Sequence, residues 1–331
     1  MSAVDVHAHV IVPELLRDAA PEEQWRPAVR RVDGRQVVEF AGRRINSMVQ
    51  EVLDPDRILA AQERAGIERV VLSPWVPLMF YDVEPEEGLH RCRLQNEGLR
   101  RMHSEHPDRV GVLGAVPLQD PVLAAAELQA LMSSGAFLGV EITASVAGVY
   151  LGDPALAPFW AAAESTGALV FIHPTTQGFS EPAFGDYYLH NLVGNPMETT
   201  LTAAHMVLAG VMERHRNLKV LLAHGGGAIL ALRGRLRHGH HAIASAGSAL
   251  SEPADVSIRR FLFDSVTHDP TLLRDLVEAV GADHVMLGSD YPFDMADPHP
   301  VETIRRAGLE EDDQTALLSG NAERLLAVAV R

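Results

Sequence analysis

Eight short apolar runs alternate along this chain with longer stretches of helical periodicity, and this alternation constrains the fold most strongly. The runs are rich in Val, Ile and Leu, and they read VDVHAHV, ERVVLSP, RVGVLGAVP, FLGVEI, ALVFIHP, KVLLAHGG, RFLFDSV and HVMLGSDYP. Strands that alternate with helices form parallel β-α units. Eight such units favour an α/β fold of the (β/α)8 TIM barrel type. An open doubly wound sheet is the alternative, but no glycine-rich dinucleotide loop follows the first run.

The helical stretches have marked ends. Asp-Pro opens the stretches at 54–66, 120–135, 153–167 and 269–281, and Asn-Pro opens the one at 195–210. An Asp or Asn side chain caps the free amides of a first helical turn, and proline is tolerated at the first helical position. The glycine that closes each stretch accepts the left-handed conformation of a helix exit. We therefore predict a helix in each of these ranges.

A long segment separates the first apolar run from the helix at 54–66, longer than is usual for a β-α connection. Within it, VRRVDGRQVVEF predicts a β-hairpin that turns at Asp33-Gly34. We interpret residues 14–50, approximately, as a small insertion into one domain that spans residues 1–331. We expect this insertion to lie over the carboxyl end of the barrel, where the active sites of such barrels form.

The first run, VDVHAHV, contains two histidines separated by one residue. Side chains alternate between the two faces of a strand, so Val4, Val6 and Ala8 are expected on one face and Asp5, His7 and His9 on the other. A single histidine inside a barrel is usually a hydrogen-bonded core residue, whereas two on one face can both reach one small ion. The pair alone does not decide between these interpretations.

Polar side chains also stand at the ends of other predicted strands, where the functional groups of a barrel lie. In chain order the whole set is His7, His9, Glu141, His173, His224, Asp264 and Asp290. Taken singly, each has a structural interpretation, such as a core histidine or a turn aspartate. Taken together, His7, His9, His173 and Asp290 suit a borderline divalent ion such as zinc, with one position left for water. We predict one such ion per chain.

Composition excludes several other classes of function. The formal net charge is −16 without a long basic run, which argues against nucleic acid or an anionic membrane as partner. The single cysteine, Cys92, excludes an internal disulfide and fits a reducing compartment. The first residues lack the charged-then-apolar pattern of a signal peptide. We therefore expect a soluble cytoplasmic protein.

The strand-end motifs occur in a recognisable order: His-x-His in the first run, HP after the fifth, HGGG after the sixth and GSDYPF after the eighth. In this order they resemble the amidohydrolase superfamily, and in particular its decarboxylase branch, typified by aminocarboxymuconate semialdehyde decarboxylase. The resemblance extends over nearly the whole chain. It is densest in PMETTLTAAHMVLAGVMERHRNLKVLLAHGGG and VGADHVMLGSDYPFDM.

The resemblance implies zinc at the four predicted ligands and His224 as the acid and base beside a metal-bound water, with Asp290 also catalytic. A bound divalent ion lowers the pKa of water towards about 7, and imidazole titrates in the same range. The glycines after His224 either let substrate approach the backbone or form a plain strand-to-helix turn. Glu141 departs from the branch, which carries an amide there. It is a second metal ligand, a partner for a cation or, like Asp264, a residue that orients ligands from behind.

Substrate contacts also follow from the resemblance. Arg235 matches an arginine that, in the family, enters the site of a neighbouring subunit and binds a substrate carboxylate, so a homodimer is implied; a solvated helix face is the alternative. The family's other carboxylate-binding arginine precedes the first helix, where Arg44 or Arg43 stands in this chain. Trp75 and Phe293 are candidates for apolar pocket walls, although core packing is the default for both.

The leading hypothesis is a zinc-dependent, non-oxidative decarboxylase of a small unsaturated or aromatic carboxylic acid. A hydrolase of the same fold, which opens a lactone or an amide with metal-bound hydroxide, needs the same metal, base and water, so the residues alone do not separate the two. A metal-binding protein without catalysis is a third hypothesis, and the complete ligand set argues against it.

Overall fold

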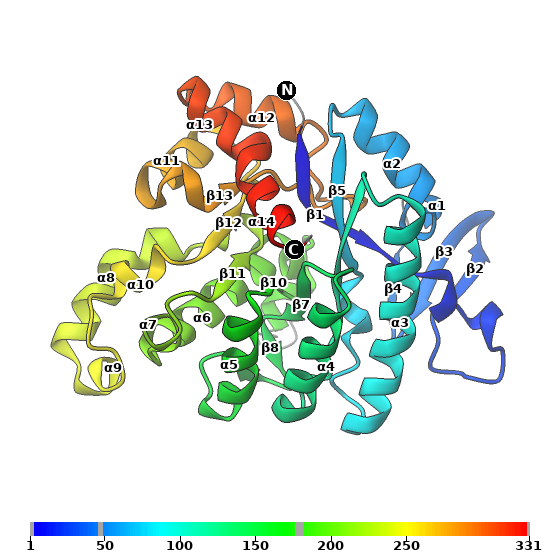
Figure 1. Cartoon of the computed structure of the whole chain (residues 1–331), viewed down its shortest axis with the longest axis horizontal. Helices are drawn as coiled ribbons and strands as arrows, with labels where there is room; N and C mark the ends of the chain where they lie inside the picture. The colour runs from blue at the N-terminus through cyan, green and yellow to red at the C-terminus, as the bar shows by residue number, and fades with distance from the viewer. Residues whose placement is uncertain (1–2, 46–48, 176–181, 330–331) are drawn as a thin grey trace.

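The eight apolar runs form one eight-stranded sheet of parallel strands (Figure 1). The computed structural model describes residues 3–45, 49–175 and 182–329. In sheet order the strands are β1 (Val4–Val10), β5 (Arg69–Pro74), β6 (Val110–Gly114), β7 (Gly139–Thr143), β10 (Leu169–His173), β11 (Lys219–Leu222), β12 (Leu262–Asp264) and β13 (Val285–Met286). The first strand also meets the last, because the amide of Val6 donates to Leu287 O at 2.9 Å and that of Asp290 to His7 O at 2.8 Å. The predicted barrel is confirmed.

Helices surround this sheet (Figure 1). They are α1 (Val49–Leu53), α2 (Pro55–Arg64), α3 (Pro85–Glu105), α4 (Pro121–Ser133), α5 (Ala157–Thr166), α6 (Asn195–Leu208), α7 (Val211–Arg214), α8 (Ile229–Ala242), α9 (Ala244–Gly247), α10 (Ala254–Ile258), α11 (Pro270–Val280), α12 (Pro300–Arg306), α13 (Glu311–Thr315) and α14 (Asn321–Ala329). The side chains of Asp54, Asp120 and Asp269 cap α2, α4 and α11, as predicted. Asp153 caps a short 3₁₀ turn that leads into α5.

Helix α6 begins at Asn195 as predicted, but the predicted capping role of Asn195 is wrong. A π-helical turn, His190–Gly194, runs directly into α6, and Asn195 has helical backbone angles, φ −59° and ψ −54°. Asn195 therefore lies inside the helix instead of capping it. Proline lacks an amide to donate, and the junction between the wider π turn and the α-helix accommodates Pro196.

The predicted hairpin is present in the insertion. Strands β2 (Ala28–Val32) and β3 (Arg35–Phe40) pair antiparallel, and the turn between them places Asp33 at φ 49° and Gly34 at φ 79°. Both values are those of a tight hairpin turn. A third strand, β4 (Arg43–Ile45), pairs with β3 and was not predicted. Positions 46–48 of the proposed insertion lie outside the described residues.

Strand β1 contains a β-bulge. Asp5 pairs with Val70 and Ala8 pairs with Leu72, so three residue steps of β1 match two of β5. An extra residue in one strand breaks the strict alternation of its side chains. The bulge therefore changes which residues of β1 face the interior of the barrel.

The expected alternation in β1 is wrong for this reason. Val6 packs inside the barrel in the same cluster as Phe171, and the ring of His7 lies 4.8 Å from the ring of Phe171. Asp5 instead accepts a hydrogen bond from Gln62 of α2, outside the barrel. The interior face carries Val4, Val6, His7 and His9. Among the described residues, no helix is both long and apolar enough to cross a lipid bilayer.

Candidate active site

The side chains of His7, His9, His173 and Asp290 converge at the carboxyl end of the barrel strands, and all four are buried. The Nε2 atoms of His7 and His9 lie 3.1 Å apart. Asp290 Oδ1 lies 3.2 Å from the first, 3.3 Å from the second and 3.9 Å from His173 Nε2. One ligand atom from each residue lies within 4.8 Å of all the others. The structure thus brings together the four predicted ligands.

The other ring nitrogen of each histidine has its own acceptor. His9 Nδ1 lies 3.0 Å from Pro74 O, and His173 Nδ1 lies 2.8 Å from Pro174 O. His7 Nδ1 lies 2.6 Å from the carboxylate of Asp264. Because these partners accept, each Nδ1 donates its proton and each Nε2 presents a lone pair to the shared point.

In the neutral tautomers, these inward lone pairs favour a bound cation. Two imidazole lone pairs 3.1 Å apart repel each other, and among the described residues neither His173 Nε2 nor Asp290 Oδ1 has a hydrogen-bond partner, although both atoms are buried. A divalent ion satisfies all four atoms at once. Three neutral imidazoles with outer hydrogen bonds and one carboxylate form a donor set that fits zinc.

Asp264 orients the site from behind. Its carboxylate bonds to His7 and accepts the backbone amides of His224, Gly225 and Val266 at 2.9, 2.7 and 3.1 Å. Burial alone would raise its pKa, but the hydrogen bond with His7 holds the pKa below the usual range. Ionised Asp264 therefore ties β12 to a metal ligand of β1 and to the segment that carries His224.

Burial and charge act differently on the ligands. Burial lowers the pKa of His173 to about 3, so this ligand is neutral near pH 7. Burial also opposes ionisation of Asp290, yet the adjacent imidazoles, first among them that of His7, hold its pKa well below the usual range. The arrangement keeps the imidazole of His173 and the carboxylate of Asp290 in the forms that bind a metal.

His224 stands beside this group with an unusual backbone. Its Nε2 lies 3.4 Å from Asp290 Oδ2, while its Nδ1 is buried without a partner among the described residues. Both His224 and Asp290 lie in the left-handed region, at φ 56° and φ 62°, where non-glycine residues are uncommon. A Cβ on Gly227 would lie 2.1 Å from Pro196 O, so this glycine allows close chain packing. Gly225 and Gly227 also line the cavity that borders His224, so the structure is compatible with both interpretations of the glycines.

Glu141 is the middle residue of β7 and not a strand-end residue as expected, and it is fully buried. Its Oε1 lies 3.7 Å from His9 Nδ1, and neither oxygen has a hydrogen-bond partner among the described residues. Burial holds its pKa well above the usual range. Glu141 is not part of the four-residue group, so this arrangement places it behind His9 and not among the ligands.

Asp5 was not predicted as a site residue, although it precedes the His-x-His motif. Its carboxylate accepts the amides of His7 at 2.9 Å and Ser289 at 3.1 Å, together with the hydroxyl of Ser289 and, at 2.8 Å, the side chain of Gln62. Ser289 immediately precedes Asp290. One buried carboxylate therefore holds the bulge of β1 and the loop after β13, and so positions ligands on both.

A cavity of about 600 Å³ opens over the ligands and is here called the metal cavity. His173 and Asp290 line it, and so do the predicted substrate contacts Arg44, Trp75 and Phe293. Phe184 and Tyr188 add aromatic surface that the sequence did not identify. The side chain of Arg43 lies outside the described part of the chain. A cavity with aromatic walls and one guanidinium suits a small aromatic acid.

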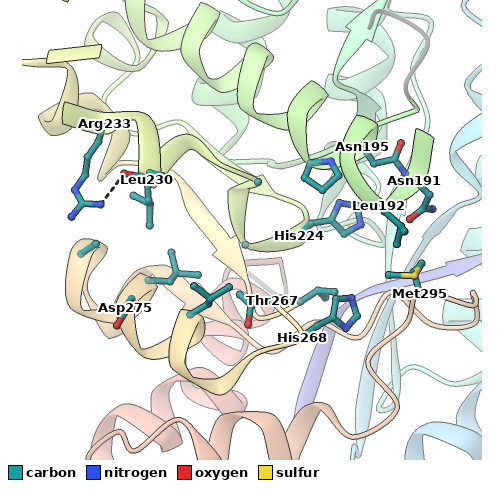
Figure 2. Close-up of a pocket in the computed structure, with 18 of the residues that line it drawn as sticks. Asn191, Leu192, Asn195, His224, Leu230, Arg233, Thr267, His268, Asp275 and Met295 are labelled. Carbon is teal, nitrogen blue, oxygen red and sulfur yellow. Dashed lines mark hydrogen bonds between the residues drawn. The ribbon is translucent and has the colours of Figure 1, made fainter. Parts of the chain in front are cut away.

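A second cavity, of about 740 Å³, borders His224 and extends between α8 and α11 (Figure 2). Asn191 and Asn195 line both cavities, so the two adjoin. In one chain Arg233 lines the second cavity, its guanidinium donating to Leu230 O at 2.7 Å (Figure 2). Arg235 lines neither cavity and is exposed on α8.

This chain is similar to known proteins in sequence and in structure. The amidohydrolase family matches residues 4–328. The 2-amino-3-carboxymuconate-6-semialdehyde decarboxylase of Dictyostelium discoideum is 31% identical over 98% of this chain and 91% of its own length. The gamma-resorcylate decarboxylase of Rhodococcus jostii is 26% identical over 97% of each chain. The structure of 5-carboxyvanillate decarboxylase LigW from Sphingomonas paucimobilis superimposes with a TM-score of 0.83 at 25% identity, over 98% of this chain and 99% of that one.

These relatives share one type of reaction, because each is a decarboxylase, that is, a carboxy-lyase. The family match covers almost the whole chain and includes all four metal-ligand candidates and His224. The chain belongs to the amidohydrolase superfamily, and within it resembles the decarboxylases typified by the aminocarboxymuconate semialdehyde enzyme.

Proposed function

We propose that this chain is a non-oxidative decarboxylase of a small aromatic or unsaturated carboxylic acid and that it depends on one zinc ion held by His7, His9, His173 and Asp290. The observation that best supports this proposal is the group of three imidazole nitrogens and one carboxylate oxygen that converge beneath a cavity with aromatic walls. The decarboxylases named above align with this chain over nearly their full length, which supports the same reaction class for this chain.

The residues divide the work as follows. The bound ion supplies a Lewis acid that holds the substrate and stabilises negative charge. Trp75 and Phe293 pack against the ring or the unsaturated chain, while Arg44 pairs with a carboxylate. His224 Nε2, beside Asp290 Oδ2, donates a proton to the carbon that loses carbon dioxide. The carbon–carbon electron pair forms the new carbon–hydrogen bond, and carbon dioxide leaves without net oxidation.

A screen with two parallel readouts tests this function. Zinc-loaded protein is incubated with unsaturated and aromatic acids and with lactones and amides. Released carbon dioxide and the acid produced by hydrolysis are recorded together. Carbon dioxide without hydrolysis supports the proposal, whereas hydrolysis alone makes the chain a hydrolase of the same fold. Metal analysis of protein grown without added metal decides between zinc and another divalent ion such as manganese.

We also propose a homodimer of one-domain chains in the cytoplasm, in which Arg235 completes the neighbour's site. Arg235 is exposed, and α8 buries only Ile229 among its residues. Leu192 and Leu272, which line the second cavity, are exposed apolar residues that a neighbour would cover. The buried thiol of Cys92 suits a reducing compartment.

Mixing two inactive variants, His224→Ala and Arg235→Ala, tests the shared site. Subunit exchange rebuilds one intact site in each mixed dimer, so activity returns to about a quarter of wild type by random pairing. Absence of recovery, with exchange demonstrated by mass-labelled subunits, places Arg235 outside the neighbour's site.

A further inference from the structure

A third large cavity lies between the insertion and α3, and none of the four candidate metal ligands lines it. It has a volume of about 690 Å³, and its lining includes Arg17, Arg26, Arg30, Arg44 and Arg91. We call it the arginine cavity. Two carboxylates, Glu39 and Asp82, also line it among the described residues. A concentration of arginine stands out in a chain with 28 basic and 44 acidic residues.

The positive charge of this cavity is only partly neutralised. Glu39 is shared, because it pairs with Arg44 and, at 3.1 Å, with Arg30. Arg17 donates to the backbone oxygens of Gln24 and Arg26, and it forms no ion pair with a carboxylate among the described residues. Glu39 and Asp82 together offer two carboxylates to the guanidiniums of Arg17, Arg30 and Arg44, which leaves a local excess of one positive charge.

Two further arginines are held in place by aromatic and acidic neighbours. The guanidinium carbons of Arg91 and Arg26 lie 4.3 and 4.9 Å from the ring centroid of Trp25. The Nε of Arg26 pairs with Glu23 at 2.8 Å and that of Arg91 with Glu87 at 2.7 Å. These two arginines therefore build a rigid wall, and Arg17, Arg30 and Arg44 provide the available charge.

The arginine cavity adjoins the metal cavity. Arg44 lines both. Between them lies a cavity of about 140 Å³, which shares Asp82 with the arginine cavity and Thr175 with the metal cavity. The three cavities thus follow one another from the insertion to the candidate metal ligands, and Arg44 lines the first and the last of them.

This row addresses a physical problem. With a formal net charge of −16, the chain repels a carboxylate at long range, and association of like charges is slow. We propose that the arginine cavity is a capture site for anionic aromatic or unsaturated acids, which it passes to Arg44 and the metal cavity. This inference rests on the proposed function for the identity of the substrate. The affinity of the arginine cavity for an aromatic dianion can be measured whether or not the protein is a decarboxylase.

The kinetic test compares Arg30→Gln and Arg17→Gln with Arg100→Gln. Arg100 is an exposed arginine of α3 that pairs with Glu97 outside the cavity, so it is a control of equal charge change. At low ionic strength each cavity variant should lower kcat/KM by about 3–10-fold, and in about 0.5 M salt by less than about 2-fold, with kcat unchanged. An equal loss in Arg100→Gln, or a loss that salt does not reduce, overturns the capture site.

A binding test needs no activity. Isophthalate is titrated calorimetrically into chelator-treated Asp290→Asn protein, in which the metal cavity lacks its ion. Arg30→Gln in this background should weaken isophthalate binding at least about 3-fold, while Arg100→Gln leaves it unchanged. Arg30 has a side chain that is 58% exposed, so its loss leaves the fold intact. Unchanged binding in Arg30→Gln refutes the capture site even where decarboxylation is found, and weakened binding supports it even where decarboxylation is not.

Discussion

Replacing Asp5 separates two effects of one buried carboxylate, its hydrogen bonds and its charge. Asp5→Ala leaves the buried amides of His7 and Ser289 without an acceptor. Asp5→Asn keeps an acceptor oxygen for both amides. The side-chain NH₂ of the new asparagine faces the Ser289 hydroxyl and the Gln62 amide, which both donate to Asp5 in the wild type. Both can accept instead, because a hydroxyl oxygen accepts hydrogen bonds and Gln62 can rotate its amide oxygen towards position 5.

The magnitudes differ strongly between the two variants. An unsatisfied buried donor costs about 1–3 kcal/mol, so Asp5→Ala should have a free energy of unfolding about 2–5 kcal/mol below that of Asp5→Asn. Burial raises the pKa of Asp5 from 3.8 to about 6, against hydrogen bonds from Ser289 and His7. A shift of about two units disfavours the ionised form by about 3 kcal/mol near pH 7. Asparagine removes this penalty, so Asp5→Asn should be more stable than wild type by up to about 3 kcal/mol at pH 7 and should match it near pH 4.

The sign of the pH dependence follows from the raised pKa. A carboxyl group whose folded pKa exceeds its unfolded value contributes stability at low pH, and this contribution is lost as pH rises through about 6. The wild type should therefore lose stability relative to Asp5→Asn between pH 4 and pH 6.5. Above that range the difference should be constant.

Urea unfolding of chelator-treated proteins measures these differences, and metal analysis of untreated proteins measures ligand geometry. Asp120→Ala is the control, because Asp120 likewise accepts two backbone amides but caps α4 on the surface, where its loss costs about 1 kcal/mol. Asp5→Ala should lose metal, and Asp5→Asn and the control should retain it. An Asn variant that is as unstable as the Ala variant, or metal retention in Asp5→Ala, refutes the assigned positioning role.

Three other outcomes are expected. After removal of metal with a chelator and addition of zinc, elemental analysis should find about one equivalent of zinc in wild type and much less in His173→Ala. A full equivalent in the variant would remove His173 from the ligand set. His224→Ala should retain metal while kcat falls by about 10²–10⁴, whereas metal loss would make His224 a ligand. Hydrogen bonds from Arg260 hold the pKa of Glu252 below its usual range. Ionised Glu252 therefore stabilises the folded protein near pH 7, and this stabilisation is lost as pH falls through the lowered pKa. Glu252→Gln should therefore be less stable by about 1–2 kcal/mol at pH 7 and equal to wild type at low pH by urea unfolding, and a pH-independent difference contradicts the assignment.

The sequence predicted the barrel and the four converging residues well, because both depend on local rules. Apolar runs and Asp-Pro caps set the strands and helices, and the carboxyl ends of parallel strands meet at one end of a barrel. The hairpin turn at Asp33-Gly34 followed from residues that tolerate a left-handed backbone. These features need no knowledge of distant partners.

The failures depend on tertiary contacts. The bulge in β1 is held by Asp5 through Ser289 and Gln62, residues far away in the sequence. The helical state of Asn195 arises from a preceding π turn that carries no composition signal. The arginine cavity joins Arg17 and Arg91, which no periodicity links. A charge count along the chain does not show such a cluster, because only folding brings these residues together.

Among the four candidate metal ligands, Asp290 lies beyond the end of its strand, whereas His7 and His9 lie within β1 and His173 ends β10. Strand β13 ends at Met286, four positions before Asp290, and β12 ends at Asp264 itself. The amide of Asp290 donates to His7 O and the amide of His9 to Tyr291 O, both at 2.8 Å, and a further interaction supports the left-handed turn at Asp290. Asp5 does this through Ser289, and Asp264 does it for His224 and His7. Two buried carboxylates outside the four-residue group thus fix the positions of the candidate metal ligands His7 and Asp290 and of His224, which explains how a loop beyond a short parallel strand can be placed with precision.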